Sequence, residues 1–421
     1  MHSILWLDDD KIKRHPIASQ LYLDLVENGN RVFLFSADED QKCKPFDYSG
    51  VDDAIKKFPQ RKEKRAIRVA RILERPICRK FKTLRKSLKG ILRYLNQSDK
   101  KLTVLVSRKI LRKKVYLKAT VKLFRFKEEI DIVLFSRAYL IFMILIRNKL
   151  LRGKNTQVVY YPFELYGHQT RSSSRLVRQL EKVFLKYKVD GLITQNDLRL
   201  EYYRRIGFEG KCLIARNYKR RKTLSSLSER TFSAKEVKLV HVGIVDEGRG
   251  IEQILEMIME TQLELTLTVY GDVRKNWMRK HYDVISRAQE AGRLYIQGSI
   301  AEIDLLCTLS NFDIGIISYD RSCLNHLYCA PSKLTDYLHS GVGVLSNSLP
   351  AMNYYSSKYD FVQTFNIEDL DSFQKACKNL NNLLSTKGKI GVAQESSELC
   401  WENESKKIQE FFREVVTKKK E

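Results

Sequence analysis

A predicted helix start near residue 331 carries residues that could bind a phosphate group. Pro331 fits the first helical position, and Lys333 falls in the first turn. The first N–H groups of a helix have no partner within the helix and carry partial positive charge, so such a start attracts anions, and Lys333 adds a cation. Asp336 could accept hydrogen bonds from sugar hydroxyls. The plainer alternative is a solvated surface lysine at an ordinary helix start.

A second candidate cation, Arg249, stands between Gly248 and Gly250, directly before a segment of helical spacing. Glycine has no side chain, so a ligand can approach the backbone closely on either side of this arginine. We therefore interpret Arg249 as a phosphate ligand rather than as a loop arginine without a ligand.

The elements that must position these residues alternate between strand and helix. Strands are predicted at Val237–Val242, Leu265–Tyr270, Leu294–Ile296, Ile314–Ile317 and Val342–Leu345. Helices are predicted at Ile251–Met259, at Ala301–Ser310 and from Pro331 to a left-handed stop at Gly341. This alternation indicates a parallel α/β sheet over residues 237–398.

An earlier α/β series occupies residues 1–216. Its predicted strands are Ile4–Leu7, Val32–Phe35, Ile130–Phe135, Gln157–Tyr161 and Gly191–Thr194, and its helices are Ile17–Glu27, Ala138–Leu151, Arg175–Tyr187 and Asp197–Ile206. The half closes at Cys212–Ala215. Because 421 residues exceed the usual size of one core, we expect two domains, a polar linker at 217–236, and a final segment, 399–421, with a helix at Trp401–Val416 and a basic tail.

The positive charge is concentrated in one segment, residues 56–127, where 27 Lys or Arg stand against three acids, a net charge of +24. Apolar residues recur there at helical spacing between basic ones, as in a cationic amphipathic helix. Such a helix can lie on an anionic membrane, where each basic residue contributes roughly 1 kcal/mol. An ordinary surface helix is the alternative. Nucleic acid would also fit the charge, but no recognisable motif or interleaving of aromatic residues supports it.

Composition indicates a globular protein, with 43% apolar residues. The eight cysteines form no Cys-x-x-Cys pair and no signal peptide is recognisable, so we expect a reducing cytoplasm. The spacing of Cys323, His326 and Cys329 matches no common zinc pattern. We expect no bound metal.

Four segments of the second half, taken in order, resemble the large retaining family 4 (group 1) of GT-B glycosyltransferases. They are His241–Ile251, Val269–Asp272, Ile296–Ser299 and the stretch Ala330–Asn347, which is similar to the family's Pro-x-Lys-x-x-Glu-Tyr-x-x-x-Gly-x-x-Val. Weaker similarity lies at Trp401-Glu402, Arg14-His15-Pro16, Asn28-Gly29, Glu164 and Arg216-Asn217. The resemblance implies an α/β GT-B fold, in which two Rossmann-like domains face each other across a cleft and a C-terminal helix returns to the N-terminal domain.

The resemblance also implies transfer of a sugar from a nucleotide sugar to a hydroxyl with retention at the anomeric carbon. Arg249 and Lys333 would stabilise the leaving diphosphate, and Asp336 would bind the ribose. The donor would further contact Gly243, Gly271, Gly298, Ser299, Pro331 and Ser332. Glu164, His15 and Arg137 would lie on the acceptor side. The fold requires no metal or other cofactor.

Three positions depart from the family pattern. Where the family often has a histidine after a strand of the N-terminal half, this chain has Ser136 and Arg137. Seven residues before Asp336, where the family has a second carboxylate, stands Tyr328, so another residue must supply that function or it is absent. Ile244 occupies a position that is often basic, which leaves more of the diphosphate's charge to Arg249 and Lys333.

The leading hypothesis is a transferase peripheral on the inner face of the cell membrane. It would move a sugar from a UDP- or GDP-sugar to a lipid-linked saccharide during synthesis of a bacterial surface polysaccharide: O-antigen, capsule or exopolysaccharide. One alternative is a nucleotide-sugar epimerase of GT-B fold, which would need no membrane-binding surface. Another is an inactive basic module that binds nucleic acid or another polyanion, against which the ordered strand-glycine series argues.

Overall fold

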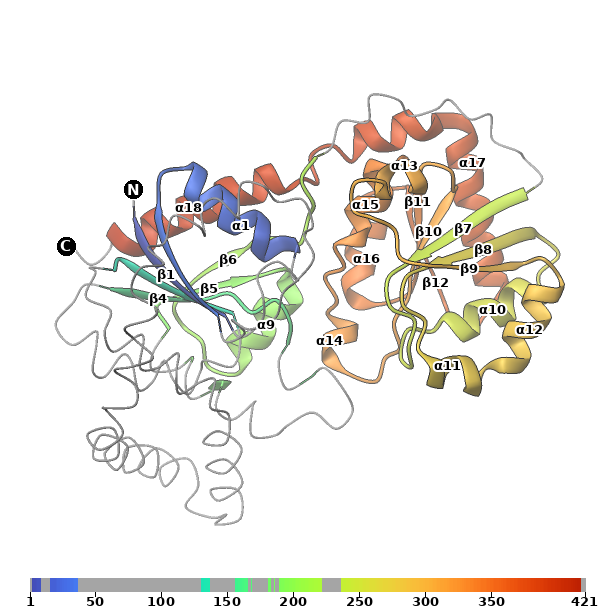
Figure 1. Cartoon of the computed structure of the whole chain (residues 1–421), viewed down its shortest axis with the longest axis horizontal. Coiled ribbons are helices and arrows are strands. Elements are labelled where there is room, and N and C mark those ends of the chain that lie inside the picture. The colour runs from blue at the N-terminus through green and yellow to red at the C-terminus, as the bar shows by residue number, and fades with distance from the viewer. Residues whose placement is uncertain are drawn as a thin grey trace, which may run out of the picture.

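The computed structural model describes residues 2–8, 16–36, 130–136, 156–165, 168, 181–182, 185, 189–221 and 236–417. These residues form two lobes, each built around a six-stranded parallel sheet (Figure 1). The basic segment 56–127 and the predicted helices Ala138–Leu151 and Arg175–Tyr187 lie outside the described residues, the last of them except for three positions.

The first sheet has the strand order β2-β1-β3-β4-β5-β6. Its strands are β1 Ser3–Asp8, β2 Arg31–Ser36, β3 Ile132–Phe135, β4 Gln157–Tyr160, β5 Gly191–Thr194 and β6 Lys211–Ile214, with helices α1 Pro16–Glu27 and α9 Asp197–Arg205. Every residue of β3, β4 and β5 is buried, as expected for parallel strands covered on both faces.

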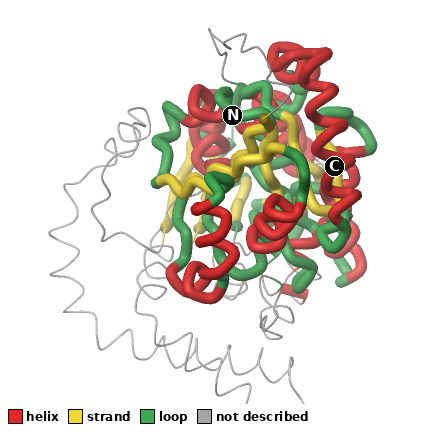
Figure 2. The backbone as a smooth tube through the Cα atoms, turned by 90° about the vertical axis from the view of Figure 1, so that its right-hand side faces the viewer, coloured by secondary structure: helices red, strands yellow, loops and turns green. Residues whose placement is uncertain are grey.

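The second sheet has the order β12-β11-β10-β7-β8-β9. Its strands are β7 Glu236–Val242, β8 Glu264–Tyr270, β9 Leu294–Gln297, β10 Ile314–Ile317, β11 Gly343–Asn347 and β12 Val362–Phe365. The helices of this half are α10 Ile251–Glu260, α11 Lys275–Lys280, α12 Tyr282–Glu290, α13 Leu305–Leu309, α14 Leu324–Leu327, α15 Lys333–His339, α16 Pro350–Ser356 and α17 Leu370–Glu395. Read from β9, the strands follow the chain order 3-2-1-4-5-6 of a Rossmann fold. Figure 2 shows the strands between layers of helix.

Each sheet has its own apolar core, and the last helix belongs to the first one. Helix α18 (Trp401–Thr417) follows α17 but runs beside α1 on the first lobe (Figure 1). Its Trp401 and Phe412 pack in the same cluster as Trp6, and the Trp401 Nε1–H donates to Asp24 at 2.6 Å. The expected architecture, two Rossmann-like halves with a returning C-terminal helix, is therefore confirmed.

Several elements differ from the sequence-based prediction. No element was predicted for α11, α12, α14, α16, β12 or α17. The helix predicted at Ala301–Ser310 is reduced to α13, since residues 302–304 form turns. The glycine stop after α15 is confirmed: Gly341 has φ +71°, and the next N–H, of Val342, donates to the Tyr337 carbonyl at 3.0 Å.

Candidate functional site

A cavity of about 390 Å³ opens between the two halves of the chain. It lies beside the carboxyl ends of β7 and β10, the two neighbouring strands at which the order of the second sheet reverses direction. Ligands of open α/β sheets bind at such a switch point, because the connections on its two sides leave in opposite directions and form a crevice. Both halves line the cavity, the first with Phe163 and Glu164 and the second with Gly243, Arg249 and Lys333.

Two cations of the second half flank one aromatic ring in this cavity. The Arg249 Cζ lies 4.8 Å from the centroid of the Tyr319 ring, and the Lys333 Nζ lies 5.8 Å from the same centroid. Lys333 also donates a hydrogen bond to the Val242 carbonyl at 3.3 Å. Neither cation forms an ion pair within the part of the chain that the structure describes. The ring and the carbonyl hold both charges in place without neutralising them, which suits a bound anion.

The pKa of Lys333 lies far below that of an ordinary lysine. Burial, followed by the positive charge of Arg249, lowers it to about 7, because both disfavour the charged ammonium. The carboxylate of Asp336 acts in the opposite direction and does not cancel these effects. A negatively charged ligand beside Lys333 would supply the missing opposite charge and restore the ammonium.

His241 stands one residue before the end of β7 and is 0% exposed. Burial, and then the charges of Lys333 and Arg249, hold its pKa well below the usual value, while the backbone of Ile316 and Ile244 acts weakly the other way. Neither ring nitrogen has a hydrogen-bond partner that meets normal geometry among the described residues. The ring is therefore neutral and adds no third charge next to the two cations.

The helix start predicted from the sequence forms one wall. Helix α15 begins at Lys333, two residues later than expected, because the N–H groups of Leu334 and Thr335 bond three residues back, to Pro331 and Ser332, at 3.2 Å each. Pro331, Ser332, Lys333 and Asp336 all line the cavity.

Two of the predicted donor-site glycines have different roles. A Cβ at Gly243, where φ is +124°, would meet nothing within 4 Å, so the backbone there is open to a ligand. A Cβ at Gly271 would lie 2.2 Å from the Gly243 carbonyl oxygen. Gly271 is thus required for the close packing of the β7 and β8 ends, and it is not among the residues that line the cavity.

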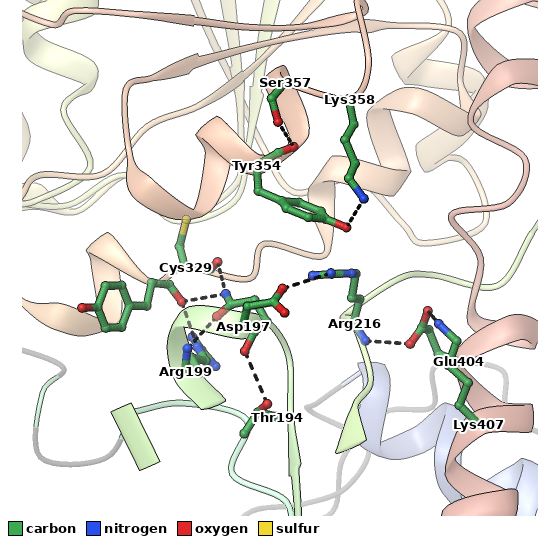
Figure 3. Close-up of polar contacts among 12 residues, drawn as sticks. Thr194, Asp197, Arg199, Arg216, Cys329, Tyr354, Ser357, Lys358, Glu404 and Lys407 are labelled. Carbon is green, nitrogen blue, oxygen red and sulfur yellow. Dashed lines mark hydrogen bonds and ion pairs between the residues drawn. The ribbon is translucent and has the colours of Figure 1, made fainter. Parts of the chain in front are cut away.

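The wall from the first half is fixed to the second half by side-chain hydrogen bonds. Arg199 of α9, 3% exposed, donates from Nε to the Tyr328 carbonyl at 2.8 Å and from Nη1 to the Phe163 carbonyl at 2.9 Å. Asn196 donates to the Cys329 carbonyl at 3.1 Å, and Figure 3 shows Arg199 of the first half near the segment at Cys329. Asn325 Oδ1 accepts from the Leu165 N–H at 2.9 Å. We call the bonds of Arg199, Asn196 and Asn325 the interdomain clasp.

The connection between the halves is also tied down near the cavity. The Arg216 Cζ lies 4.4 Å from the centroid of the Tyr354 ring, and the guanidinium pairs with Asp197 at 3.3 Å. The backbone N–H of Arg216 donates to the buried Glu404 at 2.9 Å (Figure 3). Asn217 then donates to the Ala330 carbonyl at 2.9 Å, directly before the helix start. The chain that joins the halves therefore contacts α9, α16, α18 and the cavity wall.

Sequence reasoning missed three cavity or near-cavity side chains, Tyr319, Asp320 and His326. His326 Nδ1 lies 2.7 Å from Asp320 Oδ1, and His326 and Tyr319 line the cavity. A signal for Tyr319 and Asp320 was available, since they follow β10, whose carboxyl end faces the switch point. Nothing local to the sequence indicates that His326 pairs with Asp320 or that Arg199 reaches across to Tyr328.

The structure brings together most of the predicted site residues. Those at the cavity are Gly243, Arg249, Pro331, Ser332, Lys333, Asp336 and Glu164. Gly271, Gly298 and Ser299 follow β8 and β9 and do not line it. His15 and Arg137 lie outside the described residues. Tyr328, at the position of the missing carboxylate, contributes its carbonyl to the interdomain clasp.

Among the described residues, no group of three or more His, Cys, Asp and Glu side chains is arranged to hold a metal ion. Within the same described residues, no helix has both the length and the apolar character needed to cross a bilayer.

Comparison with known proteins gives structural neighbours only. No protein-family model matches the sequence, and no curated protein matches it. Solved structures match over nearly the whole chain. Sucrose-phosphate synthase from Thermosynechococcus elongatus has a TM-score of 0.59 at 13% identity, with 99% of each chain covered. The lipopolysaccharide outer core galactosyltransferase WaaB in its apo form has 0.60 at 10% identity, again with 99% of each chain covered. Anabaena HepE in complex with UDP has 0.58 at 12% identity, with 98% of this chain and 100% of that chain covered.

These neighbours and the two Rossmann-like halves define the class: the chain has the GT-B glycosyltransferase fold. At such low identity the likeness is one of fold. What the chain does must be argued from the residues at its own cavity.

Proposed function

We propose that this chain is a glycosyltransferase that binds a nucleotide sugar, a UDP- or GDP-sugar, in the cavity between its halves. Arg249 and Lys333 bind the diphosphate, Asp336 binds the ribose, and the glycosyl group lies toward Glu164. The observation that carries the proposal is the pair of cations around the Tyr319 ring, which have no ion-pair partner among the described residues, at the switch point of a Rossmann sheet. The solved structure of HepE with bound UDP supports a uridine nucleotide as part of the donor.

The two cations suit the chemistry of glycosyl transfer. As the bond between the anomeric carbon and the diphosphate breaks, negative charge grows on the leaving oxygen. Fixed positive charges at that place stabilise the transition state more than the bound substrate, which is the condition for a faster reaction. The interdomain clasp holds the segment at Tyr328 and Cys329 against the wall at Phe163, and Lys333 is held by its hydrogen bond to the Val242 carbonyl.

Three finer points belong to the same proposal. Transfer proceeds with retention at the anomeric carbon, as the family resemblance suggests. The acceptor is a lipid-linked saccharide of a bacterial surface polysaccharide. The protein docks on the anionic inner face of the cell membrane through residues 56–127, whose net charge of +24 supports this. The reaction needs no bound metal or other cofactor.

Calorimetry with UDP, GDP and ADP tests the donor site. We expect one of the three to bind the wild-type protein, and Arg249→Gln and Lys333→Met each to weaken binding at least tenfold while melting cooperatively. Lys358→Met is the matched control, because Lys358 also stands beside a tyrosine ring, that of Tyr354 at 4.5 Å, but away from the cavity. Absence of binding by all three nucleotides at millimolar concentration would refute the donor site.

A donor panel with a lipid-linked acceptor extract tests the reaction. Transfer to the extract with an unchanged anomeric configuration, read from the proton coupling of the product, is expected. Interconversion of the sugar while it stays attached to the nucleotide would instead identify an epimerase. Binding of nucleotide without either reaction would favour the inactive module.

Vesicle flotation tests the membrane contact. Binding should require anionic lipid and weaken as salt rises from about 0.1 M, because salt screens charges beyond about 10 Å. Equal binding to neutral vesicles would contradict an electrostatic contact.

A further inference from the structure

One wall of the cavity carries an imidazole held by a carboxylate, which the proposed function does not use. His326, on the short helix α14, places Nδ1 2.7 Å from Asp320 Oδ1 and lines the cavity. The pair lies in the second half, on the loop between β10 and the start of α15.

The surroundings of Asp320 fix which proton His326 carries. Asp320 Oδ1 also accepts from the Ser322 N–H at 3.1 Å and the Ser322 hydroxyl at 2.6 Å. Burial acts to raise the pKa of Asp320, but these bonds and that from His326 outweigh it and hold the pKa below its usual value. An ionised carboxylate only accepts, so Nδ1 of His326 carries a proton. In the neutral ring Nε2 is then an acceptor, and within the described residues it has no hydrogen-bond partner.

The pair is in contact with the parts of the site assigned to the diphosphate. The His326 ring centroid lies 5.3 Å from that of Tyr319, the ring that Arg249 and Lys333 flank. A Cβ at Gly248 would lie 3.2 Å from both His326 Cε1 and Asp320 Oδ2. The loop that carries Arg249 therefore packs directly on the pair, and only glycine fits there, where φ is +84°.

The pair is also next to the wall from the first half. Asn325, the preceding residue, accepts the hydrogen bond from the Leu165 N–H, and Leu165 follows Glu164. His326 thus lies next to the place where the diphosphate binds and next to the wall toward which the glycosyl group points. The group attached directly to the diphosphate is the one that reaches this position first.

We propose that His326, oriented by Asp320, is a specificity-determining residue that accepts a hydrogen bond through Nε2 from a hydroxyl of the donor's glycosyl group. This inference rests on the proposed function. Its consequence is a preference for donors that present a hydroxyl there over donors in which that position is deoxygenated or fluorinated. The nucleotide part of the donor gains nothing from the contact.

The test compares the affinity of the protein for UDP with its affinity for one UDP-sugar. That sugar is the one among UDP-glucose, UDP-galactose and UDP-N-acetylglucosamine which the wild-type protein hydrolyses fastest. GDP and GDP-mannose replace them if the protein binds GDP instead. In His326→Ala, the Kd of the nucleotide is expected to change less than twofold and the Kd of the nucleotide sugar to weaken about tenfold, the usual effect of one lost hydrogen bond. His326→Gln, which keeps an acceptor near the Nε2 position, should recover part of the loss.

A fluorinated donor supplies the decisive arm, because fluorine in place of the hydroxyl cannot donate a hydrogen bond. At one ring position the replacement should weaken binding to the wild type about tenfold and leave the affinity of His326→Ala unchanged. His281→Ala is the matched control: His281 also contacts a carboxylate, that of Glu247 at 3.5 Å, but does not line the cavity.

Equal weakening of nucleotide and nucleotide sugar in His326→Ala would overturn the inference, since it would show that the pair only supports the loop of Arg249. Unchanged affinity for both would overturn it as well. Failure of the wild type to bind any nucleotide is a different result, which refutes the proposed function and this inference with it.

Discussion

Binding of a nucleoside diphosphate beside Lys333 is expected to take up a proton from solvent. In the ligand-free site the pKa of Lys333 is about 7, because burial and the charge of Arg249 disfavour the ammonium. The diphosphate brings negative charge next to Nζ, so in the complex the pKa returns toward the ordinary value of about 10.4. Above pH 7, most ligand-free molecules therefore contain a neutral Lys333, and the complex contains a charged one.

The size of the effect follows from the two pKa values. From a pKa of about 7, about nine-tenths of the Lys333 side chains are neutral at pH 8 and about one-tenth at pH 6. Proton uptake on binding is then about 0.9 per protein molecule at pH 8 and about 0.1 at pH 6. The same linkage weakens the affinity for UDP about 50-fold between pH 7 and pH 9.

Isothermal titration calorimetry in two buffers of different ionisation enthalpy, phosphate and Tris at pH 8, measures the number of protons. The terminal phosphate of UDP has a pKa of about 6 and is ionised at this pH, so it contributes little. Lys333→Arg is the informative variant, because the guanidinium stays charged at every pH of the experiment. It should bind UDP with no proton uptake. Arg249→Gln should take up fewer protons than the wild type, since loss of the neighbouring charge raises the ligand-free pKa of Lys333.

Two results would refute this reasoning. The first is wild-type binding of UDP at pH 8 without proton uptake, which would mean that Lys333 is already charged in the ligand-free site or does not meet the diphosphate. The second is uptake that persists in Lys333→Arg, which would assign the proton to another group. Lys358→Met, at the exposed lysine beside Tyr354, should behave as the wild type.

Three predictions concern stability, each measured by urea unfolding without ligand. The pKa of Lys333 in the folded protein lies below its pKa in the unfolded chain. The free-energy cost of burying its charge is therefore fully present below pH 7 and is lost as the pH rises toward about 10. Lys333→Met should accordingly stabilise the protein by about 1–3 kcal/mol at pH 6 and little at pH 10. Arg199→Ala leaves the Tyr328 carbonyl without the bond from Nε and should destabilise the protein by about 2–4 kcal/mol. Gly191→Ala places a Cβ 3.0 Å from Phe411 Cζ and should cost about 1–3 kcal/mol by overpacking.

Each of these has a control and a result that would contradict it. A stabilisation by Lys333→Met that is equal at pH 6 and pH 10 would exclude a charge effect. Arg204→Ala removes an arginine of the same helix whose bond to the Phe208 carbonyl stays within the first half, and a loss as large as that of Arg199→Ala would deny the interdomain clasp a special role. Gly298→Ala adds a Cβ that meets nothing within 4 Å and should cost little or slightly stabilise the protein, so a loss equal to that of Gly191→Ala would show that contact with Phe411 is not the cause.

The strands and the two cations were predictable because their signals are local. Apolar runs that stop at glycine mark the strand ends, and parallel strands bring those ends to one edge of a sheet. Arg249 follows one such position, at Gly243, and Lys333 begins helix α15 between β10 and β11, so both lie at the edge where Tyr319 stands. The helix start at Pro331 was placed two residues early, since bonds three residues back in the first turn cannot be read from residue types.

Other parts of the site could not be predicted, for a physical reason. The bond from Arg199 to Tyr328 joins residues 129 positions apart, and nothing in the local sequence of α9 distinguishes Arg199 from the arginines at 204 and 205. The pairing of His326 with Asp320 depends on a four-residue helix, α14, which is too short to produce a periodic pattern. The sequence indicated where a carboxylate was missing but not which residues stand near its place.

The returning helix α18 determines the order in which the chain can complete its cores during synthesis. Among the described residues, the buried side chains of the second half's core run from Tyr218 to Leu399, with the partly buried Leu198 packed against them. The core of the first half also needs Trp401, Phe411 and Phe412, which are synthesised after the buried residues of the second core. Domains commonly fold in the order in which they are made. Here the first half cannot complete its core until residues 401–417 have been made, and until then it exposes the apolar face of α1 that α18 covers.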